Sequence, residues 1–386
     1  MKEVIPRFAA GILISIFTIT GNGLDAVGQS APLTYSPGKG VTVDFPDQQA
    51  KAIFLGYIQG TYNYYSAEEN GAVSNEFFVR RARLDFIFRY RDRYEIFFEF
   101  DGAGTSRTQM VLAQIDVQYQ DGHFIRAGKF ITPFSPENNR SSQGLSTVER
   151  YSALNSLFLL PAFDTQFGVM LFGRFRNLDY YLSVTNGNAS ASANSREHNN
   201  HKDIQLRFSY PFTDVLRYGL SFYRSVHHSQ SLQLVGHSFS AFNRALITGR
   251  RYGLLADSEW HYGNWHTRGE LFLIRFDEPL SIEHQLGWFY GSYSELGYML
   301  RGDYHHGHQL IGRLEAGQFF DRHSSLEGTS RLYSLMVGHN WYADGIFRLQ
   351  TNFIYHRPDQ PSDLPDSRYQ GENGSFEILI MLQLRF

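Results

Sequence analysis

The chain has 386 residues and no cysteine, and its 35 Lys and Arg against 38 Asp and Glu give a formal net charge of -3. This near balance argues against a nucleic-acid partner, and the lack of cysteine excludes disulfide bonds. Aromatic residues reach 16%, yet no stretch approaches the roughly 18 consecutive apolar residues that a transmembrane helix needs.

The first residues have the charge pattern of a secretory signal peptide. Lys2 and Arg7 flank a short positive region, and an uncharged apolar run at 8–20 follows it. The run is too short for a membrane-spanning helix, and small residues come after it. We therefore expect a signal peptide at 1–28 that is removed on export, with a buried N-terminal helix as the alternative.

Farther along, apolar and polar residues alternate with period two, which predicts strands that have one apolar and one polar face. At 81–90 (RARLDFIFRY), Leu84 falls on one face and Arg81 on the other, and 376–386 (FEILIMLQLRF) alternates as far as Phe386. About sixteen such runs have the length of a tilted membrane strand. They begin near residues 53, 76, 93, 110, 122, 166, 178, 202, 215, 251, 265, 290, 308, 330, 345 and 375.

The connections between the runs alternate in length. Every second connection is a tight turn, as at 91–92, 121–122 and 263–264. The intervening connections are long and cover 66–75, 132–165, 187–201, 226–250, 277–289 and 357–374. Short turns at one end and long loops at the other are typical of an outer-membrane barrel, whereas a soluble sandwich has no reason to separate them.

These patterns predict an all-β protein that crosses the outer membrane of a Gram-negative bacterium as an antiparallel β-barrel of about sixteen strands, surrounded by outer-membrane lipid and lipopolysaccharide. The last strand closes the barrel against the first, so no sheet edge faces lipid. The predicted organisation is a signal peptide at 1–28, an N-terminal periplasmic segment at 29–52 and the barrel at 53–386.

The connection at 132–165 is the longest and is the third external loop. It is too apolar at Leu154 and 157–160 to lie freely in water, and long structured loops are usually functional. We expect it to fold into the lumen and constrict the pore, because a large barrel would otherwise leave a wide channel. An external lid on the barrel rim is the alternative. The charged residues of the constriction would be Glu137, Arg140, Glu149 and Arg150.

Charged side chains on the predicted lumen face suggest ion selection, since rings of arginine favour anions. The basic candidates are Arg81, Arg83, Arg89 and Arg126. The acidic residues expected on the same face are Asp85, Glu95, Glu99 and Asp116. Cross-strand ion pairs with a structural role are an equally good interpretation of each arginine.

A histidine cluster at His305, His306 and His308 lacks the carboxylate or cysteine partners and the spacing of a metal site, so a solvated turn is the better interpretation. The pair His227 and His228 is treated likewise. No phosphate-binding glycine loop, nucleophile elbow or zinc motif occurs. We predict no metal, no cofactor and no catalytic residues.

Three stretches, 77–86 (FFVRRARLDF), 125–138 (IRAGKFITPFSPEN) and 163–173 (FDTQFGVMLFG), resemble the phosphate-selective porin O and P family. The resemblance implies a sixteen-stranded barrel, commonly a homotrimer, that passes small solutes without an energy source. It also implies anion binding by basic residues of the channel and loop. The positions carried over are Arg81, Arg83, Lys129 and Arg140. The scarcity of lysine and the many acidic candidates depart from the phosphate-specific members.

The leading hypothesis is a porin for passive diffusion of small anions or other small polar solutes. A barrel that binds a carbohydrate or oligosaccharide and serves an importer is the alternative, and lumen aromatics such as Tyr223 or Trp260 would favour it. A barrel hydrolase would need a nucleophile with a partnered histidine near the external rim, and no motif supports one.

Overall fold

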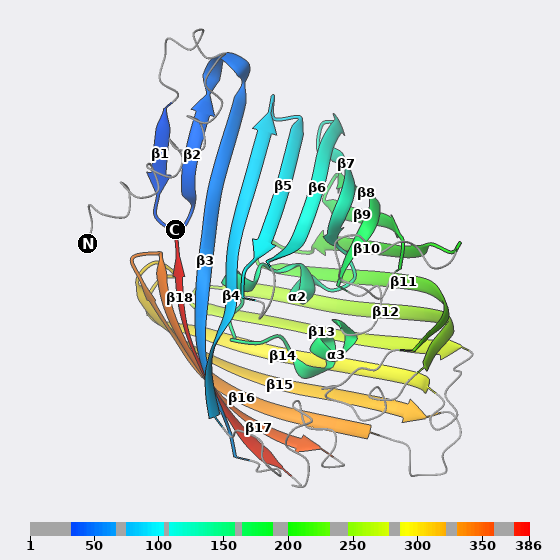
Figure 1. Ribbon diagram of the computed structural model, residues 1–386. Helices are drawn as coiled ribbons and strands as arrows, with labels where there is room; N and C mark the ends of the chain where they lie inside the picture. The colour runs from blue at the N-terminus through cyan, green and yellow to red at the C-terminus, as the bar shows by residue number, and fades with distance from the viewer. Residues whose placement is uncertain are drawn as a thin grey trace.

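The computed structural model describes residues 32–66, 75–103, 108–158, 164–187, 200–231, 246–277, 286–321, 330–358 and 374–386. Within these residues, sixteen antiparallel strands, β3 to β18, each pair with the next strand along the chain, and β18 also pairs with β3. The sheet therefore closes on itself as a barrel (Figure 1). The prediction of an all-β antiparallel barrel of sixteen strands is confirmed.

The predicted runs begin within a few residues of the observed strands. The barrel strands are β3 (Ala50–Tyr65), β4 (Asn75–Tyr90), β5 (Tyr94–Asp101), β6 (Gln109–Gln120), β7 (His123–Ile131), β8 (Thr165–Phe175), β9 (Leu178–Thr185), β10 (Asp203–Pro211), β11 (Leu216–Ser231), β12 (Leu246–Tyr262), β13 (Trp265–Asp277), β14 (Leu286–Gly302), β15 (Gly307–Asp321), β16 (Ser330–Ala343), β17 (Phe347–Pro358) and β18 (Ser375–Arg385).

The tight turns have the backbone that two-residue hairpins require. Positive φ angles occur at Arg91 (53°), Gly122 (73°), Gly263 (57°) and Asp344 (53°), as the turns that match strand twist demand. These turns lie at the end of the barrel where β18 ends. Because bacterial barrels keep their short turns in the periplasm, this end is the periplasmic one.

The two faces of the strands are inverted relative to a soluble protein. On β4, Leu84 is 58% exposed, whereas Arg81 and Asp85 are 5% and 8% exposed. On β18, Leu382 is exposed and Gln383 is buried. The apolar outer face suits hydrocarbon, since burying each large apolar side chain contributes about 1.5–3 kcal/mol. The apolar residues that alternate up to the C-terminus thus form the outer, lipid-facing side of the closing strand.

Two strands that were not predicted lie in the segment 29–52. They are β1 (Leu33–Ser36) and β2 (Gly40–Phe45), and β2 pairs with the first residues of β3. A Cβ on Gly38, whose φ is +69°, would lie 2.6 Å from the carbonyl oxygen of Gly345, so the hairpin turn lies against the turn between β16 and β17. The signal peptide expected at 1–28 lies outside the described residues.

The third loop contains short helices, η2 (Ser142–Gly144), α2 (Pro136–Asn139) and α3 (Ser152–Phe158). The helix α2 begins at Pro136, and the Ser135 hydroxyl accepts a hydrogen bond from the Asn138 amide at 3.1 Å. This is the usual N-terminal cap of a helix. Another short helix, η1 (Pro46–Gln48), joins β2 to β3. Among the described residues, no helix is both long and apolar enough to cross a membrane.

Candidate functional site

The third loop is hydrogen-bonded to polar-face side chains of strands that are far from β7 in the sheet. The Ser146 hydroxyl donates to Glu295 on β14 at 2.6 Å. The Val148 amide donates to Asn352 on β17 at 2.8 Å. Further bonds join the loop to Glu270 on β13, Arg313 on β15 and Arg348 on β17. The loop is therefore held by one side of the barrel.

Apolar contacts reinforce this attachment. Phe134, Tyr151, Leu154 and Leu157 of the loop form one buried cluster with apolar residues of β11 to β14 and of β16. A Cβ on Gly291 would lie 2.4 Å from the Phe272 ring and 2.6 Å from the Ala153 Cβ, so only glycine admits α3 this close to β14. The apolar character that the sequence showed at Leu154 and Leu157 is thus buried. Residues 159–163 lie outside the described part of the chain.

A cavity of about 510 Å³ lies between the loop and strands β4 to β8. Six arginines line it, namely Arg80, Arg81, Arg83, Arg126, Arg140 and Arg150. Four carboxylates line it as well, namely Asp85, Glu99, Asp101 and Asp164. Of the residues predicted for the pore, Arg89, Lys129, Glu137 and Glu149 do not line this cavity.

Three of the predicted arginines form ion pairs with neighbouring strands. Arg83 contacts Glu99 at 2.7 Å and Asp101 at 3.0 Å. Arg126 makes two bonds of 2.7 Å to Asp116, and Arg89 is 2.7 Å from Glu95. Lys129 is buried and donates to the Met110 carbonyl oxygen at 2.8 Å. The cross-strand interpretation therefore describes the geometry of Arg83, Arg89 and Arg126.

Arg80 is a cavity residue that the sequence did not indicate. The pairing of β3 with β4 shifts by one residue between Gln59 and Gly60, so that β4 has an extra residue at Arg80. Such a bulge re-aims a side chain that strict alternation would place on the other face. Arg80 makes two bonds to Glu149 of the loop, at 2.5 and 3.0 Å, and Arg81 lies 4.0 Å from the same carboxylate.

The charges of the loop are fixed by their surroundings. Burial alone would raise the pKa of Glu149, but the charge and hydrogen bond of Arg80 and the charges of Arg81 and Arg150 hold that pKa at about 2. Burial raises the pKa of Asp164, although Arg150, Arg83 and Lys129 oppose the shift. Glu149 is therefore ionised at any ordinary pH, whereas Asp164 is the more easily protonated carboxyl.

A second cavity, the periplasmic cavity, has a volume of about 270 Å³ and lies at the periplasmic end of the barrel. The loop contributes Gln143, Gly144 and Ser146 to it, and the turns at 303–306 and 344–346 contribute Tyr304 and Gly345. Its basic residues are His266, Arg268, Arg348 and Arg385. Gln143 also lines the first cavity, so the two cavities meet at this residue.

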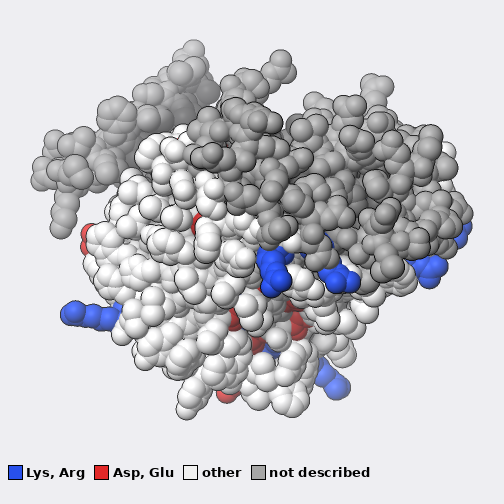
Figure 2. All heavy atoms as spheres, turned by 90° about the horizontal axis from the view of Figure 1, so that it is seen from below, with Lys and Arg blue, Asp and Glu red and all other residues white. Residues whose placement is uncertain are grey.

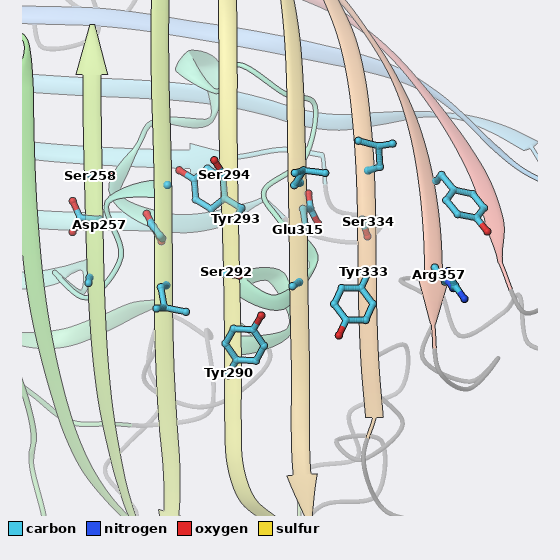
Figure 3. A pocket seen from close by; sticks show the side chains of 18 of the residues that line it. Asp257, Ser258, Tyr290, Ser292, Tyr293, Ser294, Glu315, Tyr333, Ser334 and Arg357 are labelled. Atoms are coloured by element: carbon cyan, nitrogen blue, oxygen red, sulfur yellow. The ribbon is translucent and has the colours of Figure 1, made fainter.

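A wider hollow of about 910 Å³ lies over β12 to β17 (Figure 3). Small residues, Ala256, Gly269, Ser292 and Ala316, are surrounded there by larger ones such as Tyr290 and Tyr333. These residues alternate with buried polar neighbours and so belong to the outer face. In Figure 2, most of the described surface is uncharged, and acidic and basic side chains are seen together near its middle. The hollow therefore lies on the outer face of the barrel.

The remaining candidates from the sequence are placed as follows. Trp260 alternates with the inward-facing residues of β12 and stacks on Tyr262, so it belongs to the outer face and not to the lumen as suggested. Tyr223 is fully buried against Phe134. Neither offers a free ring to a sugar. His306 is 3.3 Å from Asp344, and within the described residues no group of three possible metal ligands occurs.

A closed barrel with an apolar outer wall and a charged interior defines an outer-membrane barrel protein. The chain belongs to the phosphate-selective porin O and P family, whose model matches residues 54–386. It is an outer-membrane porin, a channel for passive diffusion of small hydrophilic solutes. The resemblance noted in the sequence is confirmed over nearly the whole barrel.

Solved porins share the fold at low sequence identity. An anion-selective porin from Comamonas acidovorans superimposes with a TM-score of 0.63 at 10% identity, covering 87% of this chain and 100% of that one. Salmonella typhi OmpF, in complex with daunomycin, gives 0.64 at 11% identity over 89% and 100%. A trimer form of Vibrio cholerae OmpT gives 0.59 at 10% identity over 87% and 99%. No match is found among curated protein sequences.

Proposed function

We propose that this porin prefers anions and that its third loop lies inside the lumen, where it divides the path into two cavities. The loop bonds to polar-face side chains on β13 to β17, and the polar face of a closed barrel is its interior. The space that the loop leaves is the first cavity, beside β4 to β8. A solute would pass through it, round Gln143, and into the periplasmic cavity.

The observation that carries the anion preference is the composition of the first cavity, where six arginines face four carboxylates. Among the lining residues, positive charge exceeds negative charge, because Glu149 and Asp116, the partners of Arg80 and Arg126, are not part of the lining. This surface attracts anions, and the ion pairs keep binding weak enough for release. In the second cavity, the lining contains three arginines and no Asp or Glu. The positive character therefore continues along the path.

Solute uptake by liposomes tests this proposal. Full-length mature protein in liposomes would admit small organic anions faster than neutral sugars of the same size, and Arg140→Gln would reduce the difference. Equal rates for anions and neutral sugars would contradict the anion preference. Liposomes that admit no solute would contradict the open path.

We also propose that the protein is exported with a signal peptide at 1–28 and acts as a homotrimer surrounded by lipid and lipopolysaccharide. The trimer form of Vibrio cholerae OmpT supports the oligomeric state, because the barrels share a fold. The proposal makes the protein a channel and not an enzyme. Cross-linking in the outer membrane would test the trimer.

A further inference from the structure

The periplasmic cavity contains two arginines with no acidic partner among the described residues. Arg348 is 5% exposed; it donates to the Leu145 carbonyl oxygen at 2.8 Å and to Gln383 at 3.0 Å. Its Nε has no hydrogen-bond partner in the described structure. Arg385 donates from Nε to the Gly345 carbonyl oxygen at 2.8 Å. A buried guanidinium with an unused donor is costly, and an anion that reached it would relieve the cost.

This environment differs from that of the first cavity. There, Arg80, Arg83 and Arg126 are each bonded to a carboxylate of the protein. In the second cavity, Arg268 alone of the three arginines is paired, with Glu259 at 3.0 Å. Arg348 and Arg385 therefore have charge that no carboxylate among the described residues neutralises, and an anion would gain more here than in the first cavity.

The rest of the cavity is larger and more aromatic than an inorganic anion requires. Its volume of about 270 Å³ equals that of about nine water molecules in the liquid. Tyr304 and Tyr342 meet edge to face with ring centroids 5.4 Å apart. Gln309 bonds to both hydroxyls, at 3.4 and 2.8 Å. Aromatic walls with a few amides and hydroxyls suit a ring that carries hydroxyl groups.

We propose that the periplasmic cavity is a binding subsite for a small hydroxylated organic acid of the size of an acidic monosaccharide. Arg348 and Arg385 would bind its carboxylate, Tyr304 and Tyr342 would contact the ring, and Gln309 and Gln383 would bond to its hydroxyls. The inference rests on the proposed function, because the solute reaches this cavity through the pore. It assigns a solute class different from inorganic phosphate.

The test is block of single-channel chloride current by glucuronate, compared with glucose and with inorganic phosphate. The full-length mature protein is compared with Arg385→Gln and Tyr304→Leu. Tyr304 is exposed in the turn at 303–306, and Arg385 is the last residue of β18, so neither substitution removes a backbone bond between strands. Arg174→Gln is the matched control, because Arg174 lies at the periplasmic rim, paired with Asp179, and lines neither cavity.

We expect glucuronate to block and glucose not to block. Arg385→Gln should raise the half-blocking concentration about tenfold, the effect of one lost charge-assisted hydrogen bond. Tyr304→Leu should weaken block by glucuronate more than block by phosphate, and Arg174→Gln should change neither. The assignment would be overturned in favour of a simple anion site if phosphate blocked as strongly as glucuronate and Tyr304→Leu did not change the block by phosphate.

Calorimetric titration of glucuronate into the detergent-solubilised protein separates this inference from the proposed function. If the native protein conducts no current but binds glucuronate, and Arg385→Gln loses this binding, the subsite is supported and the open porin is contradicted. Steady current with neither block nor binding by glucuronate would overturn the subsite and keep the porin.

Discussion

Gln59 on β3 donates its side-chain amide to the Oε1 atom of Gln383 on β18 at 2.7 Å, across the seam where the barrel closes. Each glutamine also accepts a bond of 3.0 Å from an arginine, Arg81 for Gln59 and Arg348 for Gln383. Arg81 lines the first cavity and Arg348 the second. The closing seam is therefore also the wall where the two cavities meet.

The first prediction concerns this seam. Gln383→Leu removes the bonds to Gln59 and Arg348 and the weaker one to the Gln143 carbonyl oxygen. The buried Arg348 would then lose a partner, at a cost of about 1–3 kcal/mol. We expect a lower melting temperature and a larger single-channel conductance. Gln120→Leu, at an exposed end of β6, is the control; an equal effect there would rule out the seam as the cause.

The second prediction concerns the ion pair between the loop and β4. Because the pKa of Glu149 is held at about 2, below the usual value, ionised Glu149 stabilises the loop above its unfolded pKa. This stabilisation is lost only as the pH falls through about 2. Glu149→Gln should therefore give a noisy, wider channel at neutral pH, whereas the native channel stays steady from pH 7 down to pH 4. Current records show this directly, and native noise that begins near pH 5 would contradict it.

The third prediction concerns Asp164. Burial raises its pKa, so this carboxyl takes up a proton at a higher pH than an ordinary aspartate does. Protonation removes a negative charge from the first cavity, and anion selectivity should rise as the pH falls. Asp164→Asn should show the higher selectivity already at pH 7, with a flatter pH profile. Reversal potentials measured as a function of pH would test this. A native profile as flat as that of Asp164→Asn would contradict the prediction.

The fourth prediction concerns the apolar anchor of the loop. Leu157 of α3 is fully buried in a cluster with residues of β11 to β14 and of β16. Leu157→Ala should destabilise the attachment by about 2–5 kcal/mol, the range for a buried leucine. The loop would then open to added protease while the barrel remains intact on a gel. If the loop of Leu157→Ala resisted protease as well as the native loop does, the polar bonds alone would be sufficient to hold it.

The sequence predicted the barrel well because apolar residues alternate with polar ones wherever a strand has lipid on one side and the polar interior on the other. It missed β1 and β2, since their runs are too short to show a period. It did not indicate Arg80 as a cavity residue, because a bulge depends on how β3 and β4 pair. Register also decides that Arg126 meets Asp116. The alternation along one strand therefore cannot predict which charged residues form ion pairs with each other.

The second cavity was beyond prediction for a different reason. Alternation puts Arg348 and Arg385 on the polar face of their strands, as the structure shows. Their importance arises only because Gln143 and Ser146 of a distant loop close the space above them. Loop placement depends on many weak contacts, among them the bond from Ser146 to Glu295. No local sequence pattern encodes such an arrangement.

The reversal potential of single channels across a tenfold potassium chloride gradient measures whether the pore prefers anions. An anion-permeable path lined by six arginines predicts a steady conductance with a reversal potential on the chloride side, shifted toward zero by Arg140→Gln. A reversal potential on the potassium side, or a barrel that conducts no current, would contradict the account.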